Sequence, residues 1–498
     1  MSPGRAAPSA LPGSVRYGDP SGRWILLATV LGSGLAFVDA TVVNVALPDI
    51  GSDLGAGVAG LQWTVSAYTL TLAALILLGG SLGDRYGRRR VFVVGVVWFA
   101  TASLLCGLAP DIRTLVAARA LQGVGGALLT PGSLAILQAT FHPLDRARAI
   151  GAWSGLGGIA GAVGPFLGGW LIDVANWRWA FLVNVPLAAL VVTVAARHVP
   201  ETRDPVAAAR LDLAGAALGA VGLGGVTYGL VAWPDADLDQ PRVWGALTLG
   251  AAALAAFVAD QRRSPHPMVP PSMFASRAFT AANVVTFAVY AALGGVFFLL
   301  VLNLRVVAGF SAVAAGIALL PVTVVMLLLS ARAGALAQRI GPRLPMTAGP
   351  LVAGAGVGWM SSIGTGASYV GDVLGPVTLF GLGLALTVAP LTATVLAAVD
   401  DRHAGVASGV NNAVARAGGL IAVAALPLLV GLSGAAYADP TALAPAFRAA
   451  MLICAGLLAA GGALAAALVT RPTPAPAVES PCHTYCAVAG TPLHPDRG

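Results

Sequence analysis

Long apolar stretches alternate along this chain with short segments that hold most of its charged side chains. An apolar stretch of about 18 or more residues can cross the hydrocarbon core of a membrane as a helix. A membrane β-barrel would instead show segments of about ten residues with alternating hydrophobicity. The pattern therefore predicts an all-α integral membrane protein with fourteen transmembrane helices, at about residues 24–47, 61–80, 91–109, 112–139, 147–172, 180–196, 212–233, 243–260, 277–302, 310–330, 344–363, 371–397, 405–431 and 446–469.

The composition supports a membrane protein. Of the 498 residues, 57% are hydrophobic and only 10% are charged, whereas a soluble protein has about 25% charged residues. The net charge of +7 is spread over membrane-edge loops, so it does not indicate a nucleic-acid partner. Cys106 and Cys454 lie in apolar stretches and are expected in the core, while Cys482, His483 and Cys486 would need a further ligand to hold zinc. No metal is therefore expected.

The arginines indicate the orientation in the membrane. All 28 basic residues are arginine, a bias typical of a GC-rich bacterial genome. Cytoplasmic loops of membrane proteins are enriched in basic residues. If the N-terminus is cytoplasmic, 21 arginines lie in cytoplasmic segments, and the outer loops hold five, namely Arg113, Arg178, Arg242, Arg305 and Arg448. We therefore expect a multi-pass protein of the bacterial inner (plasma) membrane with both termini in the cytoplasm.

An internal repeat divides the chain into halves. The segment 80–89 matches 334–343, 254 residues later, at Gly80, Leu82, Arg85, Gly87 and Arg89, and the same offset relates Arg23 to Arg277. The repeat predicts two six-helix bundles, at 23–197 and 271–470, with helices 7 and 8 inserted between them as a hairpin at 198–270. Residues 1–22 and 471–498 are expected to form a disordered cytoplasmic leader and tail. Two similar halves suit transport by alternating access.

Several motifs resemble those of the major facilitator superfamily, and within it the fourteen-helix drug:proton antiporter branch. The resemblance covers about residues 24–470 and is carried by Leu35–Pro48, Gly80–Arg90, Leu115–Gly126, Gly164–Gly169, Trp177–Pro186 and Leu211–Gly215. It implies the major facilitator fold and a role for Arg119 in proton transfer. It also implies that helix 5 seals the outer side and that the protein exports rather than imports, through an exporter motif at Gly164, Pro165, Gly168 and Gly169.

Asp39 and Arg119 are charged residues inside predicted spans. Asp39 is the only acid well inside a span, and acids in the membrane are costly and usually functional. We expect it to bind a proton or a cationic substrate, with Arg119 and Asn44 as the other candidate residues of the site. The structural alternative is a hydrogen bond to Ser, Thr or Asn44. Arg119 stays charged and needs a partner. It either couples protonation to conformation or only tethers backbone carbonyls, and the sequence leaves open whether it meets Asp39.

The charge-rich segment between the second and third spans is expected to form a tight turn that acts as a conformational latch. Its second copy replaces Asp84 with Gln338. The first copy is therefore interpreted as a switchable latch between the halves, and the second as an anchor. The latch residues are Gly80, Asp84, Arg85, Gly87 and Arg88. A separate polar cluster, expected near the cytoplasmic side of helix 13, offers candidate cavity residues at Asn411, Asn412 and Arg416.

These residues predict a proton-coupled secondary active exporter (antiporter) of amphipathic drugs or antibiotics, cationic drugs among them. Gly123–Gly126 follows no strand and lacks the Gly-Lys-Ser of a phosphate loop, so we expect no cofactor and a proton gradient as the energy source. With no intramembrane His or Glu, an enzyme is not expected. The expected partners are protons, an amphipathic small molecule and membrane lipid, and the chain is expected to be a monomer. The alternatives are a dedicated exporter of one metabolite, such as a self-made antibiotic, and an uptake permease.

Overall fold

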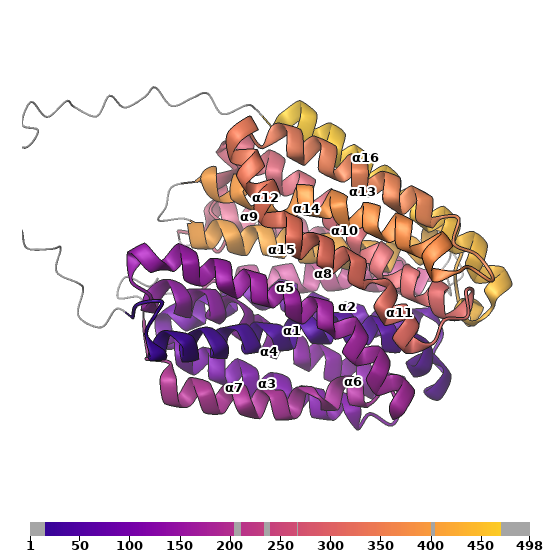
Figure 1. Ribbon diagram of the computed structural model, residues 1–498, viewed down its shortest axis with the longest axis horizontal. Coiled ribbons are helices and arrows are strands. Elements are labelled where there is room, and N and C mark those ends of the chain that lie inside the picture. The colour runs from indigo at the N-terminus through magenta and orange to yellow at the C-terminus, as the bar shows by residue number, and fades with distance from the viewer. Residues whose placement is uncertain (1–14, 204–210, 234–239, 266, 400–403, 470–498) are drawn as a thin grey trace, which may run out of the picture.

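The computed structural model describes residues 15–203, 211–233, 240–265, 267–399 and 404–469. Within these ranges the regular structure is helical, apart from one isolated bridge between Val15 and Phe141. The long helices run roughly parallel and form two groups, with both ends of the described chain at the same end of the bundle (Figure 1). We call this end the terminal face and the opposite end the far face.

The first group comprises α1 (Pro20–Asp53), α2 (Val58–Tyr86), α3 (Arg88–Gly107), α4 (Ile112–Thr140), α5 (Pro143–Val174), α6 (Trp179–Leu182) and α7 (Asn184–His198). A pair follows, α8 (Leu213–Ala232) and α9 (Pro241–Arg263). The second group comprises α10 (Arg277–Val306), α11 (Ala312–Ala318), α12 (Leu320–Ile340), α13 (Arg343–Met360), α14 (Leu374–Ala397), α15 (Ala404–Leu429) and α16 (Pro440–Leu468). Short 3₁₀ or π turns lie at Pro271–Ala275, Tyr369–Val373 and Ala436–Ala438.

Twelve helical segments of the described chain are long and apolar enough to cross a membrane. The prediction of an all-α, multi-pass membrane protein is therefore confirmed. Two further long helices, α5 with 32 residues and α13 with 18, are not among these twelve. Among the side chains of α5 that the structure describes, Val163–Val174 form one apolar stretch. In α13, Arg343 and two prolines lower the mean hydropathy. Fourteen spans were predicted, and the described chain has twelve helical segments that meet this description.

The helix bounds follow the internal repeat. Adding 254 to the bounds of α2 gives 312 and 340, which are the first residue of α11 and the last residue of α12. The joints after α2 and α12 also match, because Gly87 and Gly341 both have positive φ, at 115° and 87°. Only glycine adopts such angles readily. α2 and the α11–α12 segment are therefore equivalent elements of the two groups.

The two groups meet along two seams. At one seam α2 packs against α15, and at the other α5 packs against α11 and α12. α8 and α9 pack against each other through small residues, since a Cβ at Gly225 would lie 2.7 Å from the carbonyl oxygen of Ala246. α8 also contacts both α2 and α15, and the rings of Trp63 and Tyr228 are 6.3 Å apart. The α8–α9 pair therefore covers the α2–α15 seam.

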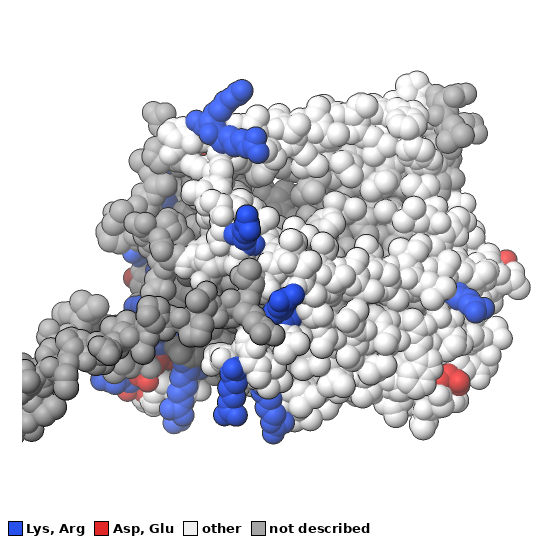
Figure 2. Space-filling view, turned by 90° about the horizontal axis from the view of Figure 1, so that it is seen from above, with Lys and Arg blue, Asp and Glu red and all other residues white. Residues whose placement is uncertain are grey.

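Charged residues lie mainly at the ends of the helices. Figure 2 shows a broad band of uncharged residues across the bundle, with most arginines of this view gathered toward the terminal face. This distribution is typical of a protein whose middle contacts lipid.

The N-terminal segment differs from the expected leader. Residues 1–14 and the tail 470–498, with Cys482, His483 and Cys486, lie outside the described residues. Val15 is held by hydrogen bonds between its backbone and those of Thr140 and His142, both 3.0 Å. α1 then begins at Pro20, a residue suited to the first turn of a helix. Residues 15–22 are therefore ordered, in contrast to the prediction for 1–22.

Candidate functional site: a buried ion pair in the first group

Asp39 and Arg119 form an ion pair inside the first group of helices. Asp39 is the twentieth of the 34 residues of α1, and Arg119 lies in α4. Arg119 Nη1 is 2.6 Å from Asp39 Oδ2, and the two side chains are 1% and 0% exposed. A buried pair of this kind compensates two charges that would each be costly alone. The structure thus brings together the two charged residues that the sequence placed inside spans.

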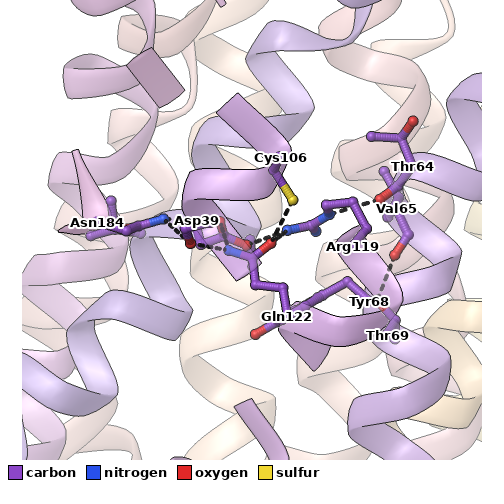
Figure 3. A network of polar contacts seen from close by, with 12 residues as sticks. Asp39, Thr64, Val65, Tyr68, Thr69, Cys106, Arg119, Gln122 and Asn184 are labelled. Carbon is purple, nitrogen blue, oxygen red and sulfur yellow. Dashed lines mark hydrogen bonds and ion pairs between the residues drawn. The ribbon is translucent and has the colours of Figure 1, made fainter. Parts of the chain in front are cut away.

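Amide and hydroxyl groups from α3, α4 and α7 complete the network around this pair (Figure 3). Gln122 Nε2 donates to Asp39 Oδ1 at 2.7 Å and to Ser103 Oγ at 2.7 Å, and its Oε1 accepts from Arg119 at 2.6 Å. Asn184 Nδ2 donates to Asp39 Oδ1 at 3.2 Å. The carboxylate therefore receives hydrogen bonds from three side chains, all of them in the first group.

Arg119 is held on its other side by α2. Its Nε donates to the carbonyl oxygen of Thr64 at 2.9 Å. Its guanidinium lies 4.4 Å from the ring centroid of Tyr68 and 5.7 Å from that of Phe181. Aromatic faces attract a cation. The arginine thus links the carboxylate on α1 to the backbone and an aromatic ring of α2.

This arrangement is suited to a protonation switch. When Asp39 gains a proton, its attraction for Arg119 falls, and the guanidinium keeps only neutral partners. The second group has no equivalent of this network. The residues 254 positions after Asp39, Arg119 and Gln122 are Leu293, Val373 and Pro376.

Sequence reasoning missed part of this network. Asn44 does not join it, because its Nδ2 donates to the carbonyl oxygen of Ala40 on the same helix, at 2.9 Å. Gln122, Asn184 and Ser103 were not singled out as site residues. One signal was present, since Gln122 lies three residues after Arg119 and therefore on the same helix face.

The polar residues of α15 form a separate cluster. Asn411 Nδ2 donates to Thr286 Oγ1 at 2.7 Å and to Asn283 Oδ1 at 3.2 Å, both on α10. Asn412 is exposed and Arg416 is half-buried. Arg416 is the thirteenth of the 26 residues of α15. It therefore lies at mid-helix, and the expectation that it lies near one face is corrected.

The segment 80–90 is mostly helical rather than a tight turn. α2 continues to Tyr86, the chain turns only at Gly87, and α3 begins at Arg88. A helix need not end where its apolar stretch ends, and here only the positive φ of Gly87 breaks it. Arg88 pairs with Asp84 at 2.8 Å on its own side of the bundle. In this conformation that ion pair does not join the two groups.

Glu201, which was not predicted as a site residue, caps the N-terminus of α3. Glu201 accepts hydrogen bonds from the backbone N–H groups of Arg89 and Arg90, at 3.1 and 3.2 Å. Its carboxylate also lies 3.8 Å from Arg89 Nε and 3.7 Å from Arg90 Nε. An acidic group at a helix N-terminus is favourable. Glu201 therefore fixes the Gly87 joint from the segment that follows α7.

The helix-5 motif packs directly against both groups. Gly164 and Gly168 lie against Thr41 and Val42 of α1, and a Cβ at Gly168 would be 2.7 Å from Val42 Cγ1. A Cβ at Gly169 would lie 2.5 Å from the carbonyl oxygen of Ala312. The backbone of Pro165 meets Gly316 of α11 in the same way. The small residues of α5 therefore allow it to approach α1 and α11 closely.

Polar bonds join the two groups toward the far face. Arg305 Nη2 is 3.0 Å from both carboxylate oxygens of Asp49. Asp173 accepts from the backbone N–H groups of Ala312 and Val313 at the start of α11, at 3.3 and 3.0 Å. These bonds tie α1 and α5 of the first group to α10 and α11 of the second.

Backbone groups add to this closure. Val58 N donates to the carbonyl oxygen of Gly434 at 2.7 Å, and Gln62 Nε2 donates to those of Val423 and Ala424 at 2.8 and 3.0 Å. The far face is therefore closed across the groups in this conformation.

Comparison with known proteins identifies the family. Residues 29–423 match the family model of the Major Facilitator Superfamily. The chain belongs to the Major Facilitator Superfamily. It is 36% identical over 435 residues to the puromycin resistance protein pur8 of Streptomyces alboniger, covering 86% of each chain. It is also 36% identical to the cephamycin export protein CmcT of Amycolatopsis lactamdurans, covering 80% of this chain and 82% of that one. This superfamily consists of transporters rather than enzymes.

Solved structures support the fold of this superfamily member. A POT family transporter in complex with a thioalcohol-conjugated peptide aligns with a TM-score of 0.69 at 14% identity, over 92% of this chain and 99% of that chain. The human organic anion transporter MFSD10 aligns with a TM-score of 0.59 at 18% identity, over 90% of this chain and 100% of that chain. Within the described residues, no group of three or more His, Cys, Asp or Glu side chains could hold a metal ion.

Proposed function

We propose that this protein is a proton-coupled secondary exporter that moves amphipathic drugs or antibiotics out of a bacterial cell. Relatives at 36% identity are named for puromycin resistance, multidrug resistance and cephamycin export. The proposed partners are an amphipathic small molecule, protons and membrane lipid. No cofactor is required, because the proton gradient supplies the energy.

The observation that carries this proposal is the buried Asp39–Arg119 pair. Asp39 is the acid found deep inside the described spans, and it is bonded to a charged partner that can be released. Proton-driven transporters place ionisable groups inside the bundle, where protonation changes the interactions between helices. Arg119 also stacks on Tyr68 of α2, so a change at Asp39 acts on α2, the helix that packs against α15.

The cycle follows alternating access. We place the terminal face in the cytoplasm of the inner membrane, since most arginines lie there. The closed far face then makes this the outward-closed conformation. The substrate enters between the two groups from the cytoplasm or the inner leaflet, the groups rock, and a proton from outside loads Asp39 as the substrate leaves.

The helix arrangement we propose is that of the fourteen-helix drug:proton antiporter branch. Under this proposal α5 and α13 also span the membrane and α8–α9 is the inserted hairpin between the two six-helix halves. The equivalence of helices related by the 254-residue offset supports this arrangement. The close packing of α8 on both α2 and α15 supports a hairpin added at the seam.

Efflux assays in a host that lacks its own drug pumps test the proposal. Cells that express the chain should accumulate less of several amphipathic antibiotics than control cells, and a proton uncoupler should abolish the difference. Accumulation that is unchanged by expression, or efflux that persists with the uncoupler, would contradict it. Protection against a single compound would support the dedicated exporter instead, and increased accumulation would support an uptake permease.

A further inference from the structure

Arg416 lies on the face of α15 that is turned toward α2. Seven residues before it, Gly409 contacts Leu77 of α2, and seven residues after it, the carbonyl oxygen of Val423 accepts from Gln62 of α2. Residues seven apart lie on the same face of a helix, about two turns away. Because α2 and α15 run antiparallel, Arg416 faces α2 between Gln62 and Leu77. It therefore lies at mid-membrane on the seam between the two groups.

The part of α2 that faces Arg416 also carries a contact of the proton site. Tyr68 lies on α2 between Gln62 and Leu77, the two residues that contact α15 on either side of Arg416. The guanidinium of Arg119 stacks on the ring of Tyr68 at 4.4 Å. A ligand at Arg416 would therefore lie at the same level of the bundle as the proton site.

Arg416 has no carboxylate partner among the residues that the structure describes. Of the charged side chains in the middle of the described spans, Asp39 and Arg119 neutralise each other at 2.6 Å. The charge of Arg416 is therefore the one positive charge in the middle of the described spans that no carboxylate compensates. Asn412, one turn earlier on α15, is exposed and also makes no hydrogen bond with the described residues. An arginine and an amide on one helix face are thus free to bind a ligand.

Charged residues inside a membrane are costly and are kept where they act on a substrate or an ion. A guanidinium binds a carboxylate through two parallel hydrogen bonds to its two charged oxygens. Neither a cationic group nor a neutral ester can form this pair of bonds. It also repels cationic ligands. We propose that Arg416 binds a carboxylate or a similar anionic group on the transported molecule, with Asn412 as a second donor. This proposal rests on the exporter function and narrows its substrate class to amphipathic molecules that carry an anionic group.

Transport of a matched pair of dyes by the full-length chain in proteoliposomes tests this proposal. Rhodamine 110 carries a free carboxylate, and rhodamine 123 is its methyl ester, so the two differ only at the group that Arg416 would bind. We expect wild-type protein to transport rhodamine 110 in preference, by about tenfold in transport efficiency. Arg416→Gln should reduce this preference to near unity, Arg416→Lys should keep part of it, and Arg448→Gln, an exposed arginine on α16, should keep all of it.

The outcomes separate the two proposals. An equal or greater rate with rhodamine 123 in wild-type protein, or a preference that is unchanged in Arg416→Gln, would overturn the anionic-substrate proposal while leaving the exporter function intact. Transport of neither dye nor of any antibiotic by wild-type protein would overturn both. If Arg416→Gln does not elute as a folded protein, the wild-type preference and the Arg416→Lys variant decide the question.

Discussion

The Nη1 atom of Arg119 lies 2.6 Å from Asp39 Oδ2, and both side chains are almost fully buried among helices of the first group. The pair joins residues 80 positions apart in the chain. Its partners are amide, hydroxyl and backbone carbonyl groups, so the network is neutral overall. Such a network is stable when the carboxylate is ionised and loses its main attraction when the carboxylate is protonated.

A double-mutant cycle measures this pair directly. Arg119→Gln leaves a buried carboxylate without its charged partner, so we expect a loss of about 3–5 kcal/mol in stability. Asp39→Asn should likewise destabilise the protein, because it leaves the buried guanidinium of Arg119 without a charged partner. The double variant should be more stable than the sum of the two losses predicts, because it leaves no unpaired charge. Thermal unfolding in detergent checks this prediction, and strictly additive losses would show that the two groups do not interact.

The contact between α5 and α11 predicts a strong effect of one added methyl group. A Cβ at Gly169 would lie 2.5 Å from the carbonyl oxygen of Ala312, so Gly169→Ala should prevent full closure of the far face and reduce efflux severalfold. Gly151 lies on the same helix with nothing within 4 Å of its Cβ position. Gly151→Ala is therefore the matched control and should transport normally. Equal efflux by both variants would show that the close approach is not needed for transport.

The ion pair between Asp49 and Arg305 should hold the far face closed. Reversing one charge, as in Arg305→Asp, places two carboxylates together and should populate a conformation with an open far face. The swapped variant Asp49→Arg with Arg305→Asp should restore closure. Spin labels at the exposed positions Ser52 and Ala435 report the separation of the groups. Distance distributions that do not differ among the three proteins would rule out a role for this pair.

Asp84 is expected to act in a conformation other than this one. Its ion pair with Arg88 is partly exposed, so Asp84→Asn should cost at most about 1 kcal/mol of stability. If Asp84 serves as a latch between the groups, the same variant should nevertheless lose most of its efflux. Gln338→Asn, at the equivalent position of the second group, is the control and should transport normally. Normal efflux by Asp84→Asn would leave the segment only an anchoring role.

Much of this fold could be predicted from the sequence because its determinants are local. The lengths of the apolar stretches predicted the positions of most long helices. Gly87 and Gly341, which both have positive φ, end equivalent helices 254 residues apart, as the sequence repeat predicted. The prediction was less accurate at helix ends, because α2 continues for six residues past Gly80 into its charged segment. α13 was predicted as a span, but it has only 18 residues, and Arg343 and two prolines within it keep it out of the twelve apolar segments.

The site could be predicted only in part. Asp39 and Arg119 stand out because each is a charge inside an apolar stretch. Their pairing depends on how α1 packs beside α4, which no local pattern determines. Asn184 joins them from the first turn of α7. Its place in an apolar stretch, within the Trp177–Pro186 segment that carries the resemblance, was a sequence signal. The role of Glu201 could not be predicted, because it depends on the segment after α7 folding back against the start of α3.

The central claim is that Asp39 couples proton movement to drug export. Proteoliposomes that contain a pH-sensitive dye measure this coupling, through the proton flux that follows addition of a transported antibiotic. Wild-type protein should move protons in the direction opposite to the drug, and Asp39→Asn, purified as a folded protein, should show neither this flux nor transport driven by a pH gradient. Undiminished drug-dependent proton flux in Asp39→Asn would contradict the account.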